Sequence, residues 1–173
     1  MLIGKRVVLR SYRIEDAEVV WEALEESRDS LIRWTPDMGR LRTEDDVRAG
    51  LTDLTSDQRE RMIFAVWDRS EERFLGEVGI YALDRSQAVG EVGYWLRATA
   101  RGHGYVSEAL DVLLRRVVMT GLMHSVQARI PFENHTSRRV VDRLGFSLAA
   151  QFCARTEWEA STANMLLYTR QLV

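Results

Sequence analysis

One stretch of the sequence constrains the fold more than any other, because its apolar residues recur with the period of an α-helix. They fall at positions i, i+3, i+4, i+7 and onward: Val106, Ala109, Leu110, Leu113, Leu114, Val117 and Val118. A helix with one continuous apolar stripe buries that stripe in a core. The spacing therefore predicts a long buried helix over residues 106–118.

Strand-like stretches lie on both sides of this helix. Short apolar or alternating runs predict strands at 6–10, 62–67, 74–83, 89–96, 126–130, 146–155 and 165–169. Further helices are predicted at 14–26, from Thr43 toward Ser56, and at 136–144, the last ended by Gly145. The order β-α-α-β-β-β-α-β-α-β-β predicts a mixed α/β fold, in which the second to fourth strands form an antiparallel meander. The long helix then makes a parallel crossover from the fourth strand to the fifth.

Length and composition favour one globular domain over residues 1–173. The chain has 173 residues, of which 46% are hydrophobic and 29% charged, and it lacks linkers and repeats. Its 24 basic and 26 acidic residues leave a net charge of -2, which disfavours nucleic-acid binding. No segment has the apolar length of a membrane span, and the start lacks a secretory signal, so a cytoplasmic protein is expected.

The residues that commonly bind metals are sparse. Cys153 is the only cysteine, which excludes an intramolecular disulfide and a cysteine-built zinc site, and it is expected to be a small core residue. His103, His124 and His135 do not form an i, i+4 pair, so no metal site is expected. The five tryptophans are expected mainly in the core, with Trp34 and Trp158 as candidates for an acceptor pocket.

The start of the long helix carries the most informative chemistry. Arg101-Gly102-His103-Gly104-Tyr105 joins the fourth strand to this helix. Alternating glycines let successive backbone N–H groups converge at the positive end of the helix dipole, which suits a phosphate group. The alternative is a tight turn that needs glycine for its geometry alone.

Other phosphate motifs do not fit this loop. No G-K-[ST] follows, as a Walker loop requires, and Ser107 replaces the third glycine of the dinucleotide fingerprint. A short cradle fits the diphosphate of a larger molecule such as coenzyme A.

Three motifs in the same order resemble the GNAT superfamily of N-acetyltransferases, and within it the Rim type that acetylates ribosomal-protein N-termini. The loop R-G-H-G-Y-V places Arg101, Gly104 and Val106 on the family's Q/R-x-x-G-x-G/A signature, with Val106 larger than the usual residue. Gly90 to Leu96 is similar to the family's G-E-x-G-Y-W strand. Asn134 to Ser137 and Leu144 to Phe146 are similar to its N-x-x-S and L-G-F elements.

The resemblance implies a GNAT-like, mostly antiparallel sheet of about seven strands with helices on both faces. It also implies acetyl-CoA as co-substrate, without a metal, bound where the fourth and fifth strands separate. The implied coenzyme-binding residues are Tyr94, Trp95, Leu96, Arg101, Gly102, His103, Gly104, Tyr105, Val106 and Asn134. Asn134 is equally well explained as the N-cap of the following helix.

Two residues are candidates for the chemistry. Strand alternation places Glu91 with Gly93 and Trp95 on one face beside the cleft, so Glu91 is the candidate general base, directly or through water. The alternative is a surface carboxylate on a half-buried strand. The resemblance implies that Ser137 lies near the thioester sulfur and donates a proton to the thiolate; alone it reads as a solvent-facing helix residue.

The sequence departs from the Rim type at one acidic position. Thr156 stands where the resemblance expects a candidate base before the final hairpin, with Glu157 and Glu159 nearby. Either the register slips by one residue or Glu91 serves instead.

The function expected is direct acetyl transfer from acetyl-CoA to a primary amine, with a protein or peptide N-terminus as the favoured acceptor. An α-amine costs about 1 kcal/mol to deprotonate at pH 7 and a lysine amine about 4.6 kcal/mol, so an α-amine needs only a modest base. The alternatives are a small-amine acetyltransferase, with an amino acid, polyamine or antibiotic as acceptor, and a catalytically silent acyl-CoA-binding module. The resemblance also suggests a homodimer.

Overall fold

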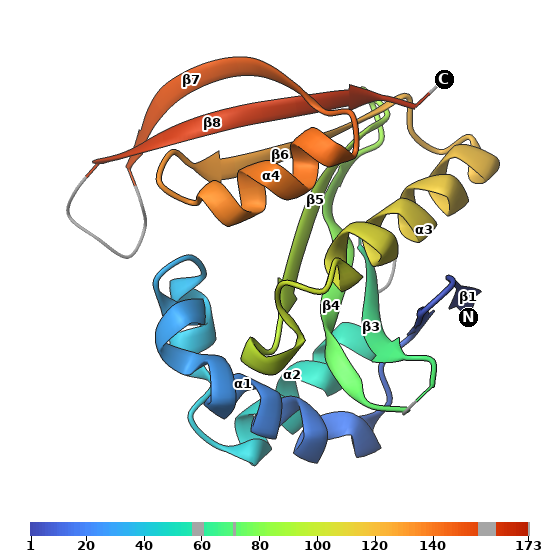
Figure 1. Cartoon of the computed structure of the whole chain (residues 1–173), viewed down its shortest axis with the longest axis vertical. Helices are drawn as coiled ribbons and strands as arrows, with labels where there is room; N and C mark the ends of the chain where they lie inside the picture. The colour runs from blue at the N-terminus through green and yellow to red at the C-terminus, as the bar shows by residue number, and fades with distance from the viewer. Residues whose placement is uncertain (57–60, 71, 156–161, 173) are drawn as a thin grey trace.

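The computed structural model describes residues 1–56, 61–70, 72–155 and 162–172 (Figure 1). These residues form one eight-stranded sheet with the strand order β1-β2-β3-β4-β5-β6-β8-β7. The strands are β1 Leu2–Ile3, β2 Val7–Arg10, β3 Met62–Asp68, β4 Phe74–Asp84, β5 Val89–Leu96, β6 Ser125–Pro131, β7 Ser147–Arg155 and β8 Thr162–Gln171. The α-helices are α1 Ala17–Ile32, α2 Glu44–Ser56, α3 Tyr105–Thr120 and α4 His135–Arg143, with 3-10 turns η1 Ile14–Asp16, η2 Pro36–Arg40 and η3 Ala98–Ala100.

The predicted topology is confirmed. Strands β3, β4 and β5 form the antiparallel meander, β7 and β8 form the closing antiparallel pair, and β5 pairs with β6 in parallel across the crossover helix α3. The sheet has eight strands instead of about seven, because the two-residue strand β1 pairs with β2.

Helices cover both faces of the sheet, each over its own core cluster. Helices α3 and α4 pack over one cluster, which contains the predicted stripe residues Leu110, Leu113 and Leu114. Helices α1 and α2 pack over the other. Helix α1 runs past the predicted end near Glu26, because its buried face continues through the small side chain of Ser27 to Leu31.

The feature that positions the site is the separation of β5 from β6. The two strands pair only from Val89 with Ser125 to Glu91 with Gln127 and then diverge, as Figure 1 shows. Beyond this point the segment 94–96 of β5 pairs only with β4 among the described strands. Its edge toward β6 is therefore open in the middle of the sheet.

Cys153 and most of the tryptophans are less buried than the sequence predicts. The prediction that Cys153 is a core residue is wrong: it is exposed on the edge strand β7, and its thiol donates to Asn164 Oδ1 at 3.3 Å. Trp95 is buried as expected, whereas the other described tryptophans, Trp21, Trp34 and Trp67, are half-buried; Trp158 lies outside the described residues. No helix in the described ranges combines the length and apolar character needed to cross a membrane.

Candidate active site

The loop before α3 has the backbone geometry that its glycines predict. Gly102 and Gly104 have φ angles of 82° and 80°, in the left-handed region that side chains rarely adopt, and Gly104 is the N-cap of α3. The first N–H groups of a helix have no partner within it. The loop therefore presents backbone donors at the positive end of a 16-residue helix.

Arg6 holds this loop from outside the cleft. Its Nη1 donates to the carbonyl of His103 at 2.9 Å, and its Nε and backbone N–H donate to the Glu108 carboxylate at 2.8 and 2.6 Å. Burial opposes ionisation of Glu108, but the hydrogen bonds from Arg6 outweigh it and lower the pKa of this carboxyl. The Tyr105 side chain points away from the cleft, because its hydroxyl donates to Asp68 Oδ2 at 3.0 Å.

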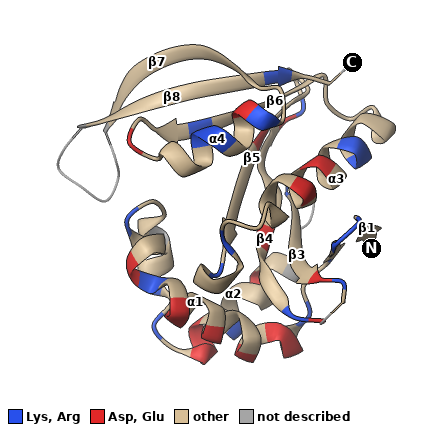
Figure 2. Cartoon of the chain, viewed as in Figure 1, with Lys and Arg blue, Asp and Glu red and all other residues tan. Residues whose placement is uncertain are grey.

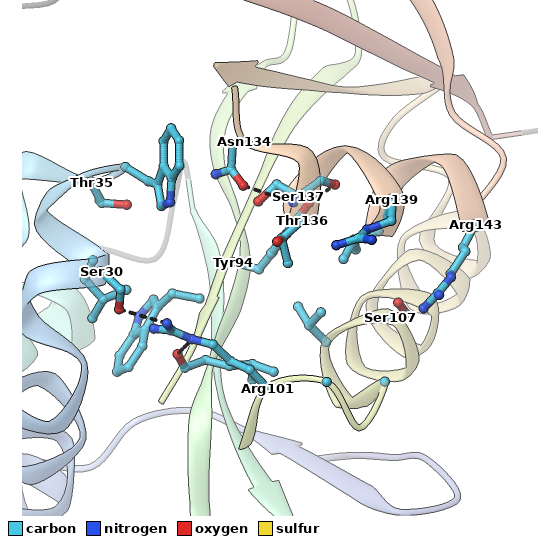
Figure 3. A pocket seen from close by; sticks show the side chains of 18 residues that line it. Ser30, Thr35, Tyr94, Arg101, Ser107, Asn134, Thr136, Ser137, Arg139 and Arg143 are labelled. Carbon is cyan, nitrogen blue, oxygen red and sulfur yellow. Dashed lines mark hydrogen bonds between the residues drawn. The ribbon is translucent and has the colours of Figure 1, made fainter. Parts of the chain in front are cut away.

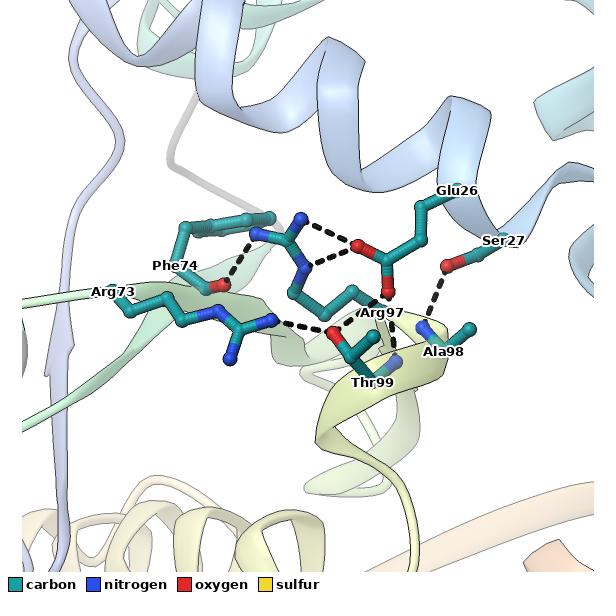
Figure 4. A network of polar contacts seen from close by, with 7 residues as sticks. All are labelled: Glu26, Ser27, Arg73, Phe74, Arg97, Ala98 and Thr99. Carbon is teal, nitrogen blue, oxygen red and sulfur yellow. Dashed lines mark hydrogen bonds and ion pairs between the residues drawn. The ribbon is translucent and has the colours of Figure 1, made fainter.

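A polar network fixes the segment that leads into the loop, as Figure 4 shows. The Glu26 carboxylate on α1 accepts hydrogen bonds from the Arg97 guanidinium and from the backbone N–H and hydroxyl of Thr99. Beside it, Ser27 Oγ accepts from the N–H of Ala98 at 2.8 Å. Helix α1 thereby sets the position of η3, which ends two residues before Gly102.

Arg101 belongs to the same framework. Its Nε donates to the carbonyl of Leu96 at 3.0 Å, and its Nη1 donates to Ser30 Oγ at 2.8 Å (Figure 3). The guanidinium thus ties the end of β5 to α1 while it lines the cleft.

A cavity of about 420 Å³ lies between this loop, β5, α1 and α4. Eight of the ten predicted coenzyme residues line it: Tyr94, Trp95, Leu96, Arg101, Gly102, Gly104, Val106 and Asn134. The two others do not. His103 is exposed, and Tyr105 points to Asp68.

The cavity also has lining residues that the sequence reasoning missed. They are Ser30, Thr35, Ser107, Thr136, Arg139 and Arg143, among others, whereas Trp34, which also lines the cavity, was a predicted pocket residue. Arg139 and Arg143 project from one side of α4 (Figure 3). Figure 2 shows basic residues on α4, whereas acidic residues predominate on α1 and α2. The i, i+4 spacing of Arg139 and Arg143 after Asn134-x-x-Ser137 was the available signal. The pair adds positive charge beside the loop.

The N-terminus of α4 is built around Asn134 and Ser137. Asn134 is buried, and its Oδ1 accepts from the N–H of Ser137 at 3.1 Å, so its expected N-cap role is confirmed. Tyr94 Oη donates to the carbonyl of Ser137 at 3.0 Å. Burial raises the pKa of Tyr94, so the phenol stays protonated and joins β5 to α4.

A second recess of about 290 Å³ adjoins the cavity where β5 and β6 separate. It is lined by η2, by Tyr81 on β4 and by parts of β5 and β6. The recess and the cavity share six lining residues: Trp34, Thr35, Tyr94, Trp95, Asn134 and Ser137. Molecules bound in the cavity and in the recess would meet at these residues.

Glu91 lines this recess on the face that alternation predicts. Both of its carboxylate oxygens accept from Arg129, at 2.9 and 2.7 Å, and this pairing raises the pKa of Arg129. A proton transferred to Glu91 would therefore weaken its ion pair with Arg129. The alternative positions, Thr156, Glu157 and Glu159, lie outside the described residues. Within those residues no three His, Cys, Asp or Glu side chains are grouped to hold a metal ion.

Comparison with known proteins agrees with this geometry. Residues 6–147 match the acetyltransferase (GNAT) domain family. The probable N-acetyltransferase YjcK of Bacillus subtilis (strain 168) is 25% identical over 154 residues, covering 84% of this chain and 83% of the relative.

Two solved structures are similar across nearly the whole chain. RimL, a ribosomal L7/L12 alpha-N-protein acetyltransferase in complex with coenzyme A, has a TM-score of 0.90 at 15% identity, over 98% of this chain and 96% of its own. The microcin C7 self-immunity acetyltransferase MccE, in complex with acetyl-CoA and AMP, also has a TM-score of 0.90, at 16% identity over 97% and 93% of the two chains.

The described residues fit the coenzyme, because a helix N-terminus with two left-handed glycines faces a cavity beside an open strand edge. The chain therefore belongs to the GNAT acetyltransferase family and is an acetyl-CoA-dependent N-acetyltransferase.

Proposed function

We propose that residues 1–173 form a single N-acetyltransferase domain whose acceptor is the N-terminal amine of a protein or peptide. The observation that carries this is the character of the second recess. Among its described lining residues the only acid is Glu91, which is already paired with Arg129, while Trp34, Met38 and Tyr81 are aromatic or apolar. A polyamine would need further acidic side chains to hold its several charges.

The energetics agree with an α-amine. At pH 7 such an amine costs about 1 kcal/mol to deprotonate, against about 4.6 kcal/mol for a lysine amine. Glu91, which is held in an ion pair with Arg129, is a weak base and can deprotonate an α-amine more easily than a lysine amine. The likeness of the fold to RimL, an alpha-N-protein acetyltransferase, supports the same acceptor.

The coenzyme's place follows from the cavity. We propose that its diphosphate accepts hydrogen bonds from the N–H groups of residues 102–106, with the carbonyl of His103 already held away by Arg6. Its pantetheine arm would lie along the open edge of Tyr94 to Leu96 as an added strand. Asn134 and the half-buried Trp34 would then close the cavity near the acetyl group.

The proposed chemistry uses the two candidate residues. Glu91 accepts the proton that the nitrogen loses as the C–N bond forms, directly or through water. Ser137, which lines both the cavity and the recess, donates a proton to the thiolate as the C–S bond breaks and regains one through water from Glu91.

A small amine is the second candidate acceptor. It is favoured by the size of the recess, about 290 Å³, which accommodates a small molecule. The similar structure of MccE contains AMP as well as acetyl-CoA, so this fold also accommodates a small molecule beside the coenzyme.

The acceptor is tested by following free thiol while the protein turns over acetyl-CoA. Peptides with different N-terminal residues are compared with the same peptides carrying a blocked N-terminus, and with amino acids, polyamines and aminoglycosides. The proposal predicts the highest kcat/KM for free-N-terminus peptides and no turnover of blocked ones. Faster turnover of a small amine would contradict it. Sedimentation equilibrium tests the homodimer that the resemblance suggests.

A further inference from the structure

A second carboxyl group, Glu77, lies beneath the acceptor recess. Glu77 on β4 is in register with Trp95 on β5, on the sheet face that α1 and α2 cover. Its carboxylate accepts a hydrogen bond from Tyr81 Oη. Tyr12 Oη and Trp95 Nε1 are fully buried and approach the same carboxylate without completing a hydrogen bond, and neither has another partner among the residues that the structure describes.

Gly93 leaves the space that the Tyr81 ring occupies. Gly79 on β4 and Gly93 on β5 are partners in the sheet register. A Cβ atom on Gly93 would lie 2.7 Å from Cε2 of the Tyr81 ring, closer than real Cβ atoms come to a neighbour. The ring therefore packs against Gly93, and its hydroxyl reaches Glu77, four residues earlier on its own strand.

Tyr81 is the connection between the recess and the buried carboxyl. Tyr81 lines the recess together with Glu91 and Gly93, whereas Glu77 is not part of that lining. A phenol can accept a hydrogen bond from a group in the recess while it donates its own proton to Glu77. The arrangement thus has the connectivity of a two-step proton path.

The electrostatics suit a proton acceptor at the buried end. Burial raises the pKa of Glu77, and the hydrogen bond from Tyr81, with the nearby Tyr12 and Trp95 donors, offsets this effect only in part. Burial likewise keeps the pKa of Tyr81 well above its usual value, so the phenol retains a proton to donate.

Few other charges act on this pair. Arg61, just before β3, acts on Tyr81, and Asp16 acts on Tyr12. Helices α1 and α2 contribute apolar residues to this side of the sheet, namely Ala17, Val20, Ala23, Leu24, Leu31, Val47 and Leu51. Among the residues that the structure describes, no arginine pairs with Glu77 as Arg129 pairs with Glu91.

We propose that Tyr81 and Glu77 form a relay that removes the first proton from the acceptor's ammonium group. The ammonium N–H bond breaks and its proton passes to Tyr81 Oη, while the Tyr81 proton passes to Glu77, which becomes a neutral carboxylic acid. The neutral amine then attacks the thioester, and the second proton follows the Glu91 and Ser137 route. Glu77 returns its proton to solvent after product release. This role deepens the proposed function and rests on it only for the acceptor's class, a primary amine.

The experiment compares pH–rate profiles of the wild type, Tyr81→Phe and Glu77→Gln at saturating acetyl-CoA. It uses whichever primary amine the wild type acetylates fastest, so failure of the peptide assignment leaves the relay test intact. For an α-amine of pKa about 7.8, about one molecule in 20 is neutral at pH 6.5. Both variants should therefore lose up to about 20-fold in kcat at pH 6.5 and less than about 2-fold at pH 9. If the acceptor amine is more basic, the kcat of the variants should recover at a correspondingly higher pH, near the pKa of that amine.

Tyr12→Phe is the matched control, because it removes a buried phenol that approaches the same carboxylate without lining the recess. If the relay operates, Tyr12→Phe should not show a loss of kcat at pH 6.5 that disappears at pH 9. It also predicts that Tyr81→Phe combined with Glu77→Gln is no slower than the slower single variant. Equal losses at every pH, no loss in Tyr81→Phe, or the same pH-dependent loss in Tyr12→Phe would overturn the relay. If Glu77→Gln fails to fold, Tyr81→Phe alone decides.

Discussion

The carboxylate of Glu26 on α1 accepts two hydrogen bonds from the guanidinium of Arg97, at 2.9 and 2.5 Å, across 71 residues of sequence. The same carboxylate also accepts from Thr99, at the start of the segment that leads into the coenzyme loop. Burial disfavours ionisation, yet the hydrogen bonds from Arg97 and Thr99 prevail and lower the pKa of Glu26 to about 2. Helix α1, whose last turn lines the coenzyme cavity, thus also positions the loop that leads into α3.

Glu26→Gln should weaken both folding and coenzyme binding. Its ion pair is partly exposed, so we expect a loss of about 1 kcal/mol in the free energy of unfolding and a several-fold higher Kd for acetyl-CoA. Urea unfolding and calorimetric titration measure these. Glu22→Gln, on the exposed side of the same helix, is the control. Equal effects in the two variants would contradict the positioning role.

The stabilisation by Glu26 should depend on pH with a defined sign. Because its folded-state pKa of about 2 lies below its ordinary value of 4.5, its contribution is present above pH 4.5 and is lost as the pH falls toward 2. The difference in unfolding free energy between wild type and Glu26→Gln should therefore shrink between pH 5 and pH 2. A difference that grows with acidification would be inconsistent with this pairing.

Gly104→Ala separates backbone strain from coenzyme contact. Its added Cβ would make only ordinary contact with Arg6, so the direct cost is the left-handed φ, about 1 kcal/mol of stability. We also expect a tenfold or larger increase in the Kd for acetyl-CoA, because the N–H groups shift. Gly121→Ala carries a similar strain, with φ of 62°, at the opposite end of α3. It should destabilise the fold equally and leave the Kd unchanged.

Arg139 and Arg143 should contribute to coenzyme affinity by charge. Alanine at either position is expected to raise the Kd for acetyl-CoA a few-fold at low salt, and less at high salt, because exposed charges are screened. Titrations at 50 mM and 500 mM salt measure the effect. Arg115→Ala on the exposed side of α3, outside the cavity, is the comparison. A salt-independent loss would indicate a packing role instead.

Glu91→Gln tests the proposed general base. We expect kcat to fall by about 10² to 10⁴ with the Kd of acetyl-CoA nearly unchanged. Arg129→Ala separates the base from its partner, because it frees the carboxylate without removing it. An unchanged rate in Glu91→Gln would move this role away from Glu91.

Much of the fold could be predicted because its signals are local. The 3.6-residue period of α3, the glycine after α4 and the runs of the meander depend on nearby residues, and the structure has all of them. The continuation of α1 to Ile32 was missed, because residues 27–30 are polar and only the packing of Leu31 shows that the buried face continues. The exposure of Cys153 was missed because sequence does not reveal which strand forms the sheet edge.

The site was predicted as far as its motifs extend. The loop glycines and Asn134 lie where the motifs imply, at one cavity. The pairing of Glu91 with Arg129 and the contact of Tyr81 with Glu77 were not foreseen, because both depend on side-chain packing over the sheet. Arg129 is 38 residues from Glu91 and becomes its neighbour only through the parallel crossover.

The proposed mechanism depends on the backbone after Arg101 binding the coenzyme's diphosphate. A crystal structure of the chain with acetyl-CoA shows directly whether it does. We expect diphosphate oxygens within hydrogen-bonding distance of the N–H groups between Gly102 and Val106, with the thioester beside Ser137. Coenzyme bound elsewhere, or a loop closed by its own side chains with no coenzyme present, would contradict it.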